Sequence, residues 1–132
     1  MDYSRGLSLS VWLVGSLVLS TCGSSNSSTP SDSGTGSGLT CPKGGAPVAT
    51  TSVTVADFSF TPECIVVPAG STVTWTNTGM PIHTVTSDTG AFDSGQLGNA
   101  GVFHFAFADP GTFNYHCIAH QSLGMVGTVM VQ

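Results

Sequence analysis

The side chains with the greatest capacity for chemistry lie in one short segment near the C-terminus, Cys117 to Met125. The segment reads CIAHQSLGM and holds a thiol, an imidazole and a thioether in the spacing C-x2-H-x4-M. A thiolate and imidazoles with a weak axial thioether favour copper in both oxidation states, whereas hard-oxygen metals prefer carboxylates, which this segment lacks. The segment therefore predicts a site for one copper ion, with Cys117, His120 and Met125 as candidate ligands.

A third strong ligand must come from another part of the chain. His83 is the candidate, because it follows a proline-containing turn and opens an expected strand at residues 83–86. Adjacent strands of a sandwich can bring such a residue beside Cys117. His104 is expected to be a solvated strand residue, since it alternates with apolar neighbours.

The elements that must position these residues are short strands. From Val48 onward, stretches that alternate between apolar and polar residues are separated by Gly, Pro, Asn or Asp. About seven strands result, which predicts an all-β, two-sheet sandwich. The expected strands include residues 53–55, 65–67, 72–76, 83–86, 103–107, 113–117 and 126–131.

Several motifs together resemble those of the plastocyanins and related small blue copper proteins, the cupredoxins. They are the loop spacing, the exit GMVG at 124–127, the turn DPGT at 109–112, the aromatic strand before the cysteine and the Pro-x-His at 81–83. The resemblance covers the chain from about residue 50 to the end and implies a Greek-key sandwich. It also implies a trigonal copper plane, with a long axial thioether ligand. The implied ligands are His83, Cys117, His120 and Met125.

Four positions matter for how closely the chain follows this family. Ala119 stands where the plastocyanin pattern usually has Pro, and Ile82 is inserted between the Pro and the His. Thr84 replaces the Asn that usually braces the cysteine loop. We expect the ligands to be retained and the tuning of the site to differ. His116 stands where the family has a surface aromatic on one electron route, which makes it a candidate for a similar role.

The resemblance implies a small, monomeric electron carrier whose copper cycles between Cu(I) and Cu(II). Its partners would be redox proteins, a donor and an acceptor, that dock near the exposed edge of His120. An apolar rim of Met80, Pro81, Ile82 and Leu123 suits brief docking. The alternative is a copper-binding storage or delivery module of the cell envelope, which needs similar ligands but no change of valence.

Other classes of function are excluded by composition. The net charge is −5, and after residue 22 the chain has one Lys and no Arg, so it cannot neutralise the phosphates of a nucleic acid. Four His cannot build a trinuclear copper centre, and four widely separated Cys cannot build a binuclear one. Cys117 and His120 lack an orienting third group for hydrolysis. We expect no enzyme.

The first 40 of the 132 residues read as an export signal and a tether. Residues 7–19 form an apolar run behind Arg5 that suits a secretory signal and is short for a membrane span. The sequence LSTC at 19–22 resembles a lipobox, so Cys22 is a candidate for lipidation; ordinary cleavage nearby or an uncleaved anchor remain alternatives. In residues 23–40, 14 of 18 residues are Gly, Ser or Thr, which is typical of a flexible tether. The domain prediction is therefore 1–22, 23–40 and 41–132.

This organisation predicts an exported protein, in the periplasm or on the outer face of the membrane. Membrane contact would come only through the N-terminal signal or lipid anchor. If Cys22 carries lipid and Cys117 carries copper, Cys41 and Cys64 remain. An oxidising compartment would allow these two to form a disulfide.

Overall fold

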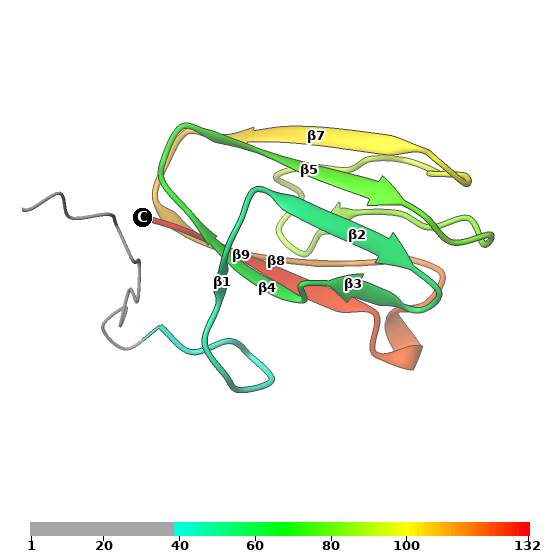
Figure 1. Cartoon of the computed structure of the whole chain (residues 1–132), viewed down its shortest axis with the longest axis horizontal. Helices are drawn as coiled ribbons and strands as arrows, with labels where there is room; N and C mark the ends of the chain where they lie inside the picture. The colour runs from blue at the N-terminus through cyan, green and yellow to red at the C-terminus, as the bar shows by residue number, and fades with distance from the viewer. Residues whose placement is uncertain (1–38) are drawn as a thin grey trace, which may run out of the picture. The chain divides into compact units, whose positions relative to one another are not determined.

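The computed structural model describes residues 39–132, and the predicted export signal, Cys22 and most of the tether lie outside the described residues. The described part is a sandwich of two mixed β-sheets, which confirms the predicted fold class (Figure 1). Among these residues no helix has the length and apolar character needed to cross a membrane. The elements are β1 (Val48–Ala49), β2 (Ser52–Ala56), β3 (Ser59–Thr61), β4 (Cys64–Val67), β5 (Ser71–Asn77), β6 (Thr86–Ser87), β7 (Val102–Phe107), β8 (Gly111–His116), the 3-10 helix η1 (Gln121–Leu123) and β9 (Val126–Val131).

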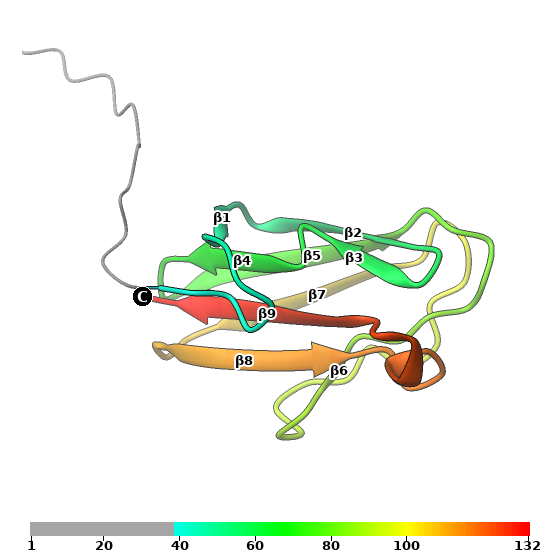
Figure 2. The ribbon, with the colours of Figure 1, turned by 90° about the horizontal axis from the view of Figure 1, so that it is seen from below.

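Nine strands are described instead of about seven, because the short strands β1 and β3 were not predicted. One sheet has the order β1-β4-β9-β8-β6 and the other has the order β3-β2-β5-β7. β5 and β8 both end at the same end of the sandwich, where the β2–β3 turn and η1 also lie (Figures 1 and 2). The predicted ligands follow these strand ends, so the topology gathers them at one end of the molecule.

The prediction of a strand at residues 83–86 is wrong in part. His83 forms only an isolated bridge with Leu97, and regular pairing begins at Thr86. The reason is that two backbone N–H groups between them donate to side chains. Thr84 N donates to the Cys117 sulfur (3.4 Å) and Val85 N donates to a serine hydroxyl, that of Ser94 (2.8 Å).

Aromatic packing between the sheets fixes the strands that carry the loop of Cys117. Trp75 of β5 and Tyr115 of β8 are almost fully buried and meet edge to face, with ring centroids 5.5 Å apart. The Tyr115 ring lies directly over Gly127 of β9, where an added Cβ would be 2.3 Å from the ring carbon Cζ. Glycine at 127 therefore allows the ring to approach the β9 backbone.

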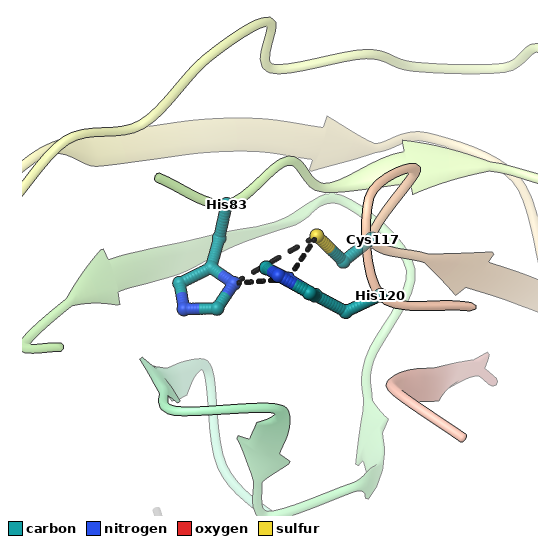
Figure 3. Close-up of side chains that lie close together, drawn as sticks. All are labelled: His83, Cys117 and His120. Carbon is teal, nitrogen blue, oxygen red and sulfur yellow. Dashed lines mark hydrogen bonds between the residues drawn. The ribbon is translucent and has the colours of Figure 1, made fainter. Parts of the chain in front are cut away.

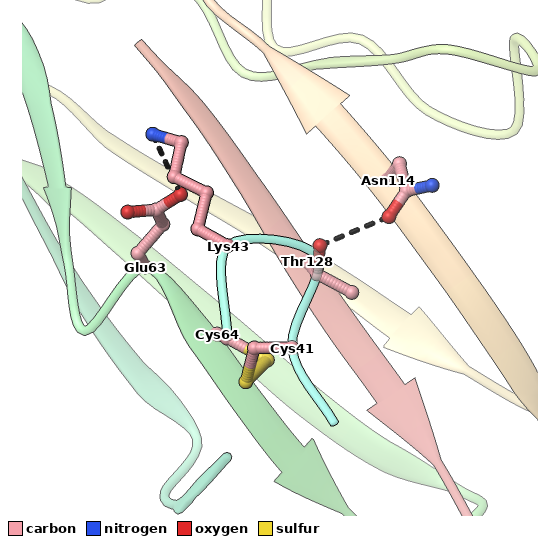
Figure 4. Close-up of a disulfide and its surroundings, with 6 residues drawn as sticks. All are labelled: Cys41, Lys43, Glu63, Cys64, Asn114 and Thr128. Carbon is pink, nitrogen blue, oxygen red and sulfur yellow. Dashed lines mark hydrogen bonds and ion pairs between the residues drawn. A yellow bond between two sulfur atoms is a disulfide. The ribbon is translucent and has the colours of Figure 1, made fainter. Parts of the chain in front are cut away.

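The start of the described chain is fastened to β4. Cys41 and Cys64 form a disulfide, and Leu39, at the end of the expected tether, packs in the same apolar cluster (Figure 4). Lys43 pairs with Glu63 (Nζ to Oε1, 2.8 Å). Lys43 Nζ also donates to the carbonyl of Gly124 (3.1 Å), so this segment contacts the residue that precedes Met125.

We expect Gly127→Ala to lower the free energy of unfolding by about 1–3 kcal/mol, because the added methyl group must displace the Tyr115 ring. Urea unfolding of the full chain measures this change. Gly98→Ala is the matched control, since a Cβ there meets nothing within 4 Å. Equal stability of the two variants would contradict the tight contact between Tyr115 and β9.

Candidate metal centre

Three predicted ligands meet at the end of the sandwich, with their donor atoms facing one another (Figure 3). The Cys117 sulfur lies 3.7 Å from Nδ1 of His83 and 3.4 Å from Nδ1 of His120. The two Nδ1 atoms are 3.2 Å apart. The side chains thus form a triangle of one sulfur and two nitrogens.

The size of this triangle fits a first-row metal ion. A point equidistant from three atoms with these separations lies about 2.0 Å from each, which is the length of a zinc–imidazole bond and about 0.3 Å less than that of a zinc–thiolate bond. A thiolate with two imidazoles is a donor set that suits copper. The triangle contains no carboxylate, so metal ions that prefer oxygen ligands, such as Mg²⁺ and Ca²⁺, would bind it weakly.

His83 is held in place by its backbone. It is fully buried, and it exchanges two backbone hydrogen bonds with Leu97 (3.0 and 2.8 Å). Burial, together with the neighbouring His120, lowers the pKa of His83 below its usual value. The imidazole is therefore neutral at neutral pH, which is the form that binds a metal ion.

The loop from Cys117 to Met125 closes on itself. The backbone N–H of Cys117 donates to the carbonyl of Met125 (3.1 Å), and those of His120 and Met125 donate to the carbonyls of Cys117 (3.1 Å) and His120 (3.3 Å), respectively. Gly124 ends η1 in the left-handed conformation, at φ 85°, which turns the chain into β9. Cys117 and Met125 are both fully buried in the same core cluster, so the predicted axial residue, at the end of this loop, is shielded from solvent.

Thr84 braces this loop from the strand side. Its hydroxyl accepts a hydrogen bond from the backbone N–H of Ile118 (2.9 Å), and its own N–H donates to the Cys117 sulfur (3.4 Å). Thr84 therefore links the segment of His83 to the segment of Cys117 directly. A brace is present at the position where the family has Asn, although the side chain is shorter.

The other two histidines lie outside the triangle. His104 is exposed, as predicted, and bonds to the hydroxyl of Thr74 through Nδ1 (2.9 Å). His116 points to the outer side of β8, where its Nδ1 pairs with Asp88. Neither contributes a donor atom to the centre.

Phe58 contacts the centre and was missed from the sequence. Its ring meets the His120 imidazole edge to face, with centroids 4.8 Å apart and planes at 88°. Phe58 lies in the turn between β2 and β3, and β3 was not predicted. Asp57 favours turns, but neither Gly nor Asn follows it, so the sequence marked a tight turn there only weakly.

Comparison with known proteins gives the same result as the donor geometry. A family model described as copper binding proteins, plastocyanin/azurin family, matches residues 47–132. The chain is 34% identical to a plastocyanin of Scenedesmus fuscus over 84 residues, which cover 55% of this chain and 86% of that protein. It is 36% identical to amicyanin-alpha of Methylorubrum extorquens over 93 residues, which cover 66% and 76% respectively.

A solved structure of a purple cupredoxin from Nitrosopumilus maritimus is also similar. It is 26% identical and superposes with a TM-score of 0.57, over 63% of this chain and 100% of that one. The arrangement of His83, Cys117, His120 and Met125 is consistent with one type 1 copper. The chain therefore belongs to the plastocyanin/azurin family of copper-binding proteins, and it is a type 1 copper electron-transfer protein.

Proposed function

We propose that His83, Cys117 and His120 bind one copper ion in a plane, with Met125 as a weak axial ligand. In this role the protein carries single electrons between two redox proteins. The observation that carries the proposal is the triangle of Sγ and two Nδ1 atoms, whose sides of 3.2–3.7 Å suit one ion. When bound, copper supplies a one-electron couple between Cu(II) and Cu(I).

The contribution of the protein is to keep the ligands in one geometry. Backbone pairing with Leu97 fixes His83, and the closed loop fixes Cys117 and His120. A site that already accommodates both oxidation states needs little ligand movement when an electron arrives. This property favours a carrier over a storage or delivery module, which needs no such match between the two states.

Exchange with partners would occur through the face that surrounds His120. His120 itself is partly exposed, and large apolar side chains in the turn before His83 and in η1 are open to solvent. Met80 is 82% exposed, Ile82 53% and Leu123 65%. Such a patch suits brief docking by a monomeric carrier, and the net charge of −5 would steer a positively charged partner at low ionic strength.

We propose that the protein is exported and is not an enzyme. The apolar run at 7–19 and the Cys41–Cys64 disulfide support an oxidising compartment outside the cytoplasm, because disulfides persist there. Lipidation at Cys22 would then tether the domain at 41–132 to the membrane through residues 23–40. The similarity to plastocyanin and amicyanin supports the role of an electron carrier instead of an enzyme.

Cys117→Ser should abolish the intense colour of the copper-loaded protein, because that colour comes from charge transfer between thiolate and Cu(II). Visible absorption after addition of Cu(II) measures it. The matched control is the double variant Cys41→Ser with Cys64→Ser, which should keep the colour. Intense colour in Cys117→Ser would contradict the proposed carrier. Binding of Cu(I) alone by the unaltered protein would contradict it as well.

Met125→Gln should retain copper and lower the reduction potential, because an amide oxygen favours Cu(II) more than a thioether does. Protein-film voltammetry measures the shift. Met80→Gln makes the same change on an exposed side chain and should leave the potential unaltered. Equal potentials in Met125→Gln and the unaltered protein would show that Met125 is not axial.

Thr84→Val should lower the free energy of unfolding of the copper-loaded protein by about 1–2 kcal/mol, because the N–H of Ile118 loses its acceptor. Urea unfolding followed by circular dichroism measures the loss. Thr84→Ser keeps the hydroxyl and should restore most of the stability. If valine is tolerated as well as serine, Thr84 does not brace the loop.

A further inference from the structure

Phe58 adopts a backbone conformation that a bulky side chain rarely takes. It is the second residue of the two-residue turn between Ala56 and Ser59, and its φ is 61°. Gly or Asn is the usual residue at such a position, because a side chain with a large Cβ substituent is strained there. Phe58 is also 48% exposed, so core packing does not explain its presence. An outlier of this kind is a reason to look for a function.

The turn at Asp57 and Phe58 packs against Thr78 and Gly79, in the segment that leads to His83. The backbone N–H of Thr78 donates to the carbonyl of Val55 (2.8 Å), at the end of β2. Asp57 lies so close to Gly79 that a Cβ there would be 2.6 Å from Oδ1. The turn therefore holds Phe58 in a fixed place instead of leaving it as a mobile flap.

The fixed place is against His120. The two rings meet edge to face at 88°, with centroids 4.8 Å apart, which is a favoured arrangement for aromatic pairs. Within residues 39–132 the other ring that packs on His120 is that of His83, at 5.0 Å. His83 is itself a proposed ligand. Phe58 is therefore the aromatic contact that reaches His120 from outside the centre.

His120 needs such a contact more than His83 does. His83 is fully buried, whereas His120 is partly exposed and lies at the start of η1 in a loop. The torsion that turns an imidazole ring about its Cβ–Cγ bond has broad, weakly defined minima. Packing must therefore decide the direction in which Nδ1 of His120 points.

We propose that Phe58 is a positioning residue of the copper centre, whose ring holds the His120 imidazole in one orientation during reduction and oxidation. The inference rests on the proposed function, with His120 as a ligand. One electron enters from a reduced partner protein and leaves to an oxidised one, and no bond to His120 forms or breaks. The ring contact keeps the distance between copper and Nδ1 similar in both states, which keeps electron exchange fast.

Phe58→Gly in the full, copper-loaded chain is the principal test. Glycine accepts a φ of 61°, so this variant removes the ring without straining the turn. We expect the rate of electron self-exchange, from NMR line broadening in mixtures of both oxidation states, to fall about tenfold, because an aromatic contact shifts a conformational population by up to about that factor. X-ray absorption should also show a larger change in copper–nitrogen distance on reduction.

Three further variants separate positioning from other roles. Phe58→Tyr keeps the ring and should exchange electrons at the original rate. Phe58→Leu keeps an apolar surface for docking but has no ring, and it should remain slow. Ala100→Gly relieves the same φ of 61° at another turn and should exchange at the original rate.

The inference is overturned if Phe58→Gly exchanges electrons as fast as the unaltered protein, or if Phe58→Leu restores the full rate. Neither result affects the proposed function, which requires only that the unaltered protein binds copper with a thiolate colour and cycles reversibly. Loss of that colour or of that cycling in the unaltered protein would instead overturn the proposed function itself.

Discussion

The structure depends on one constraint, which is that three donor atoms must surround one metal position although their segments are far apart in the sequence. His83 and Cys117 are separated by 34 residues. His83 reaches that point from the segment after β5, and Cys117 and His120 reach it from the loop after β8. Neither segment forms the centre alone. The pairing of His83 with Leu97 fixes the first segment, and the contact of Thr84 with the cysteine loop joins it to the second, so the metal site depends on the whole sandwich.

Packing beneath and beside the loop serves the same constraint. Tyr115 lies over Gly127, so the strands on both sides of the copper loop are fixed by one close contact. Lys43, held next to the disulfide at Cys41, reaches the carbonyl of Gly124 just before Met125. On the outer side, Phe58 has a strained, positive φ, and its ring contacts His120. These contacts lie on different elements and restrict the same loop.

Much of this arrangement was predictable, because alternation of apolar and polar residues marks strands and the C-x2-H-x4-M spacing marks a soft-metal loop. Contacts that depend on where two distant segments meet were not. The N–H groups of Thr84 and Val85 donate to side chains, which interrupts the strand expected at 83–86. The β2–β3 turn has no Gly or Asn, so Phe58 gave no sign of its place beside His120.

We propose that the folded chain holds its ligands in a geometry that serves both oxidation states. Crystal structures of the protein with Cu(II), after reduction to Cu(I), and without metal are the decisive experiment. We expect the separations of the Cys117 sulfur from Nδ1 of His83 and of His120, and of the two Nδ1 atoms from each other, to stay close to 3.7, 3.4 and 3.2 Å in all three structures. A ligand that swings away from the triangle on reduction, or a centre that forms only after copper binds, would contradict it.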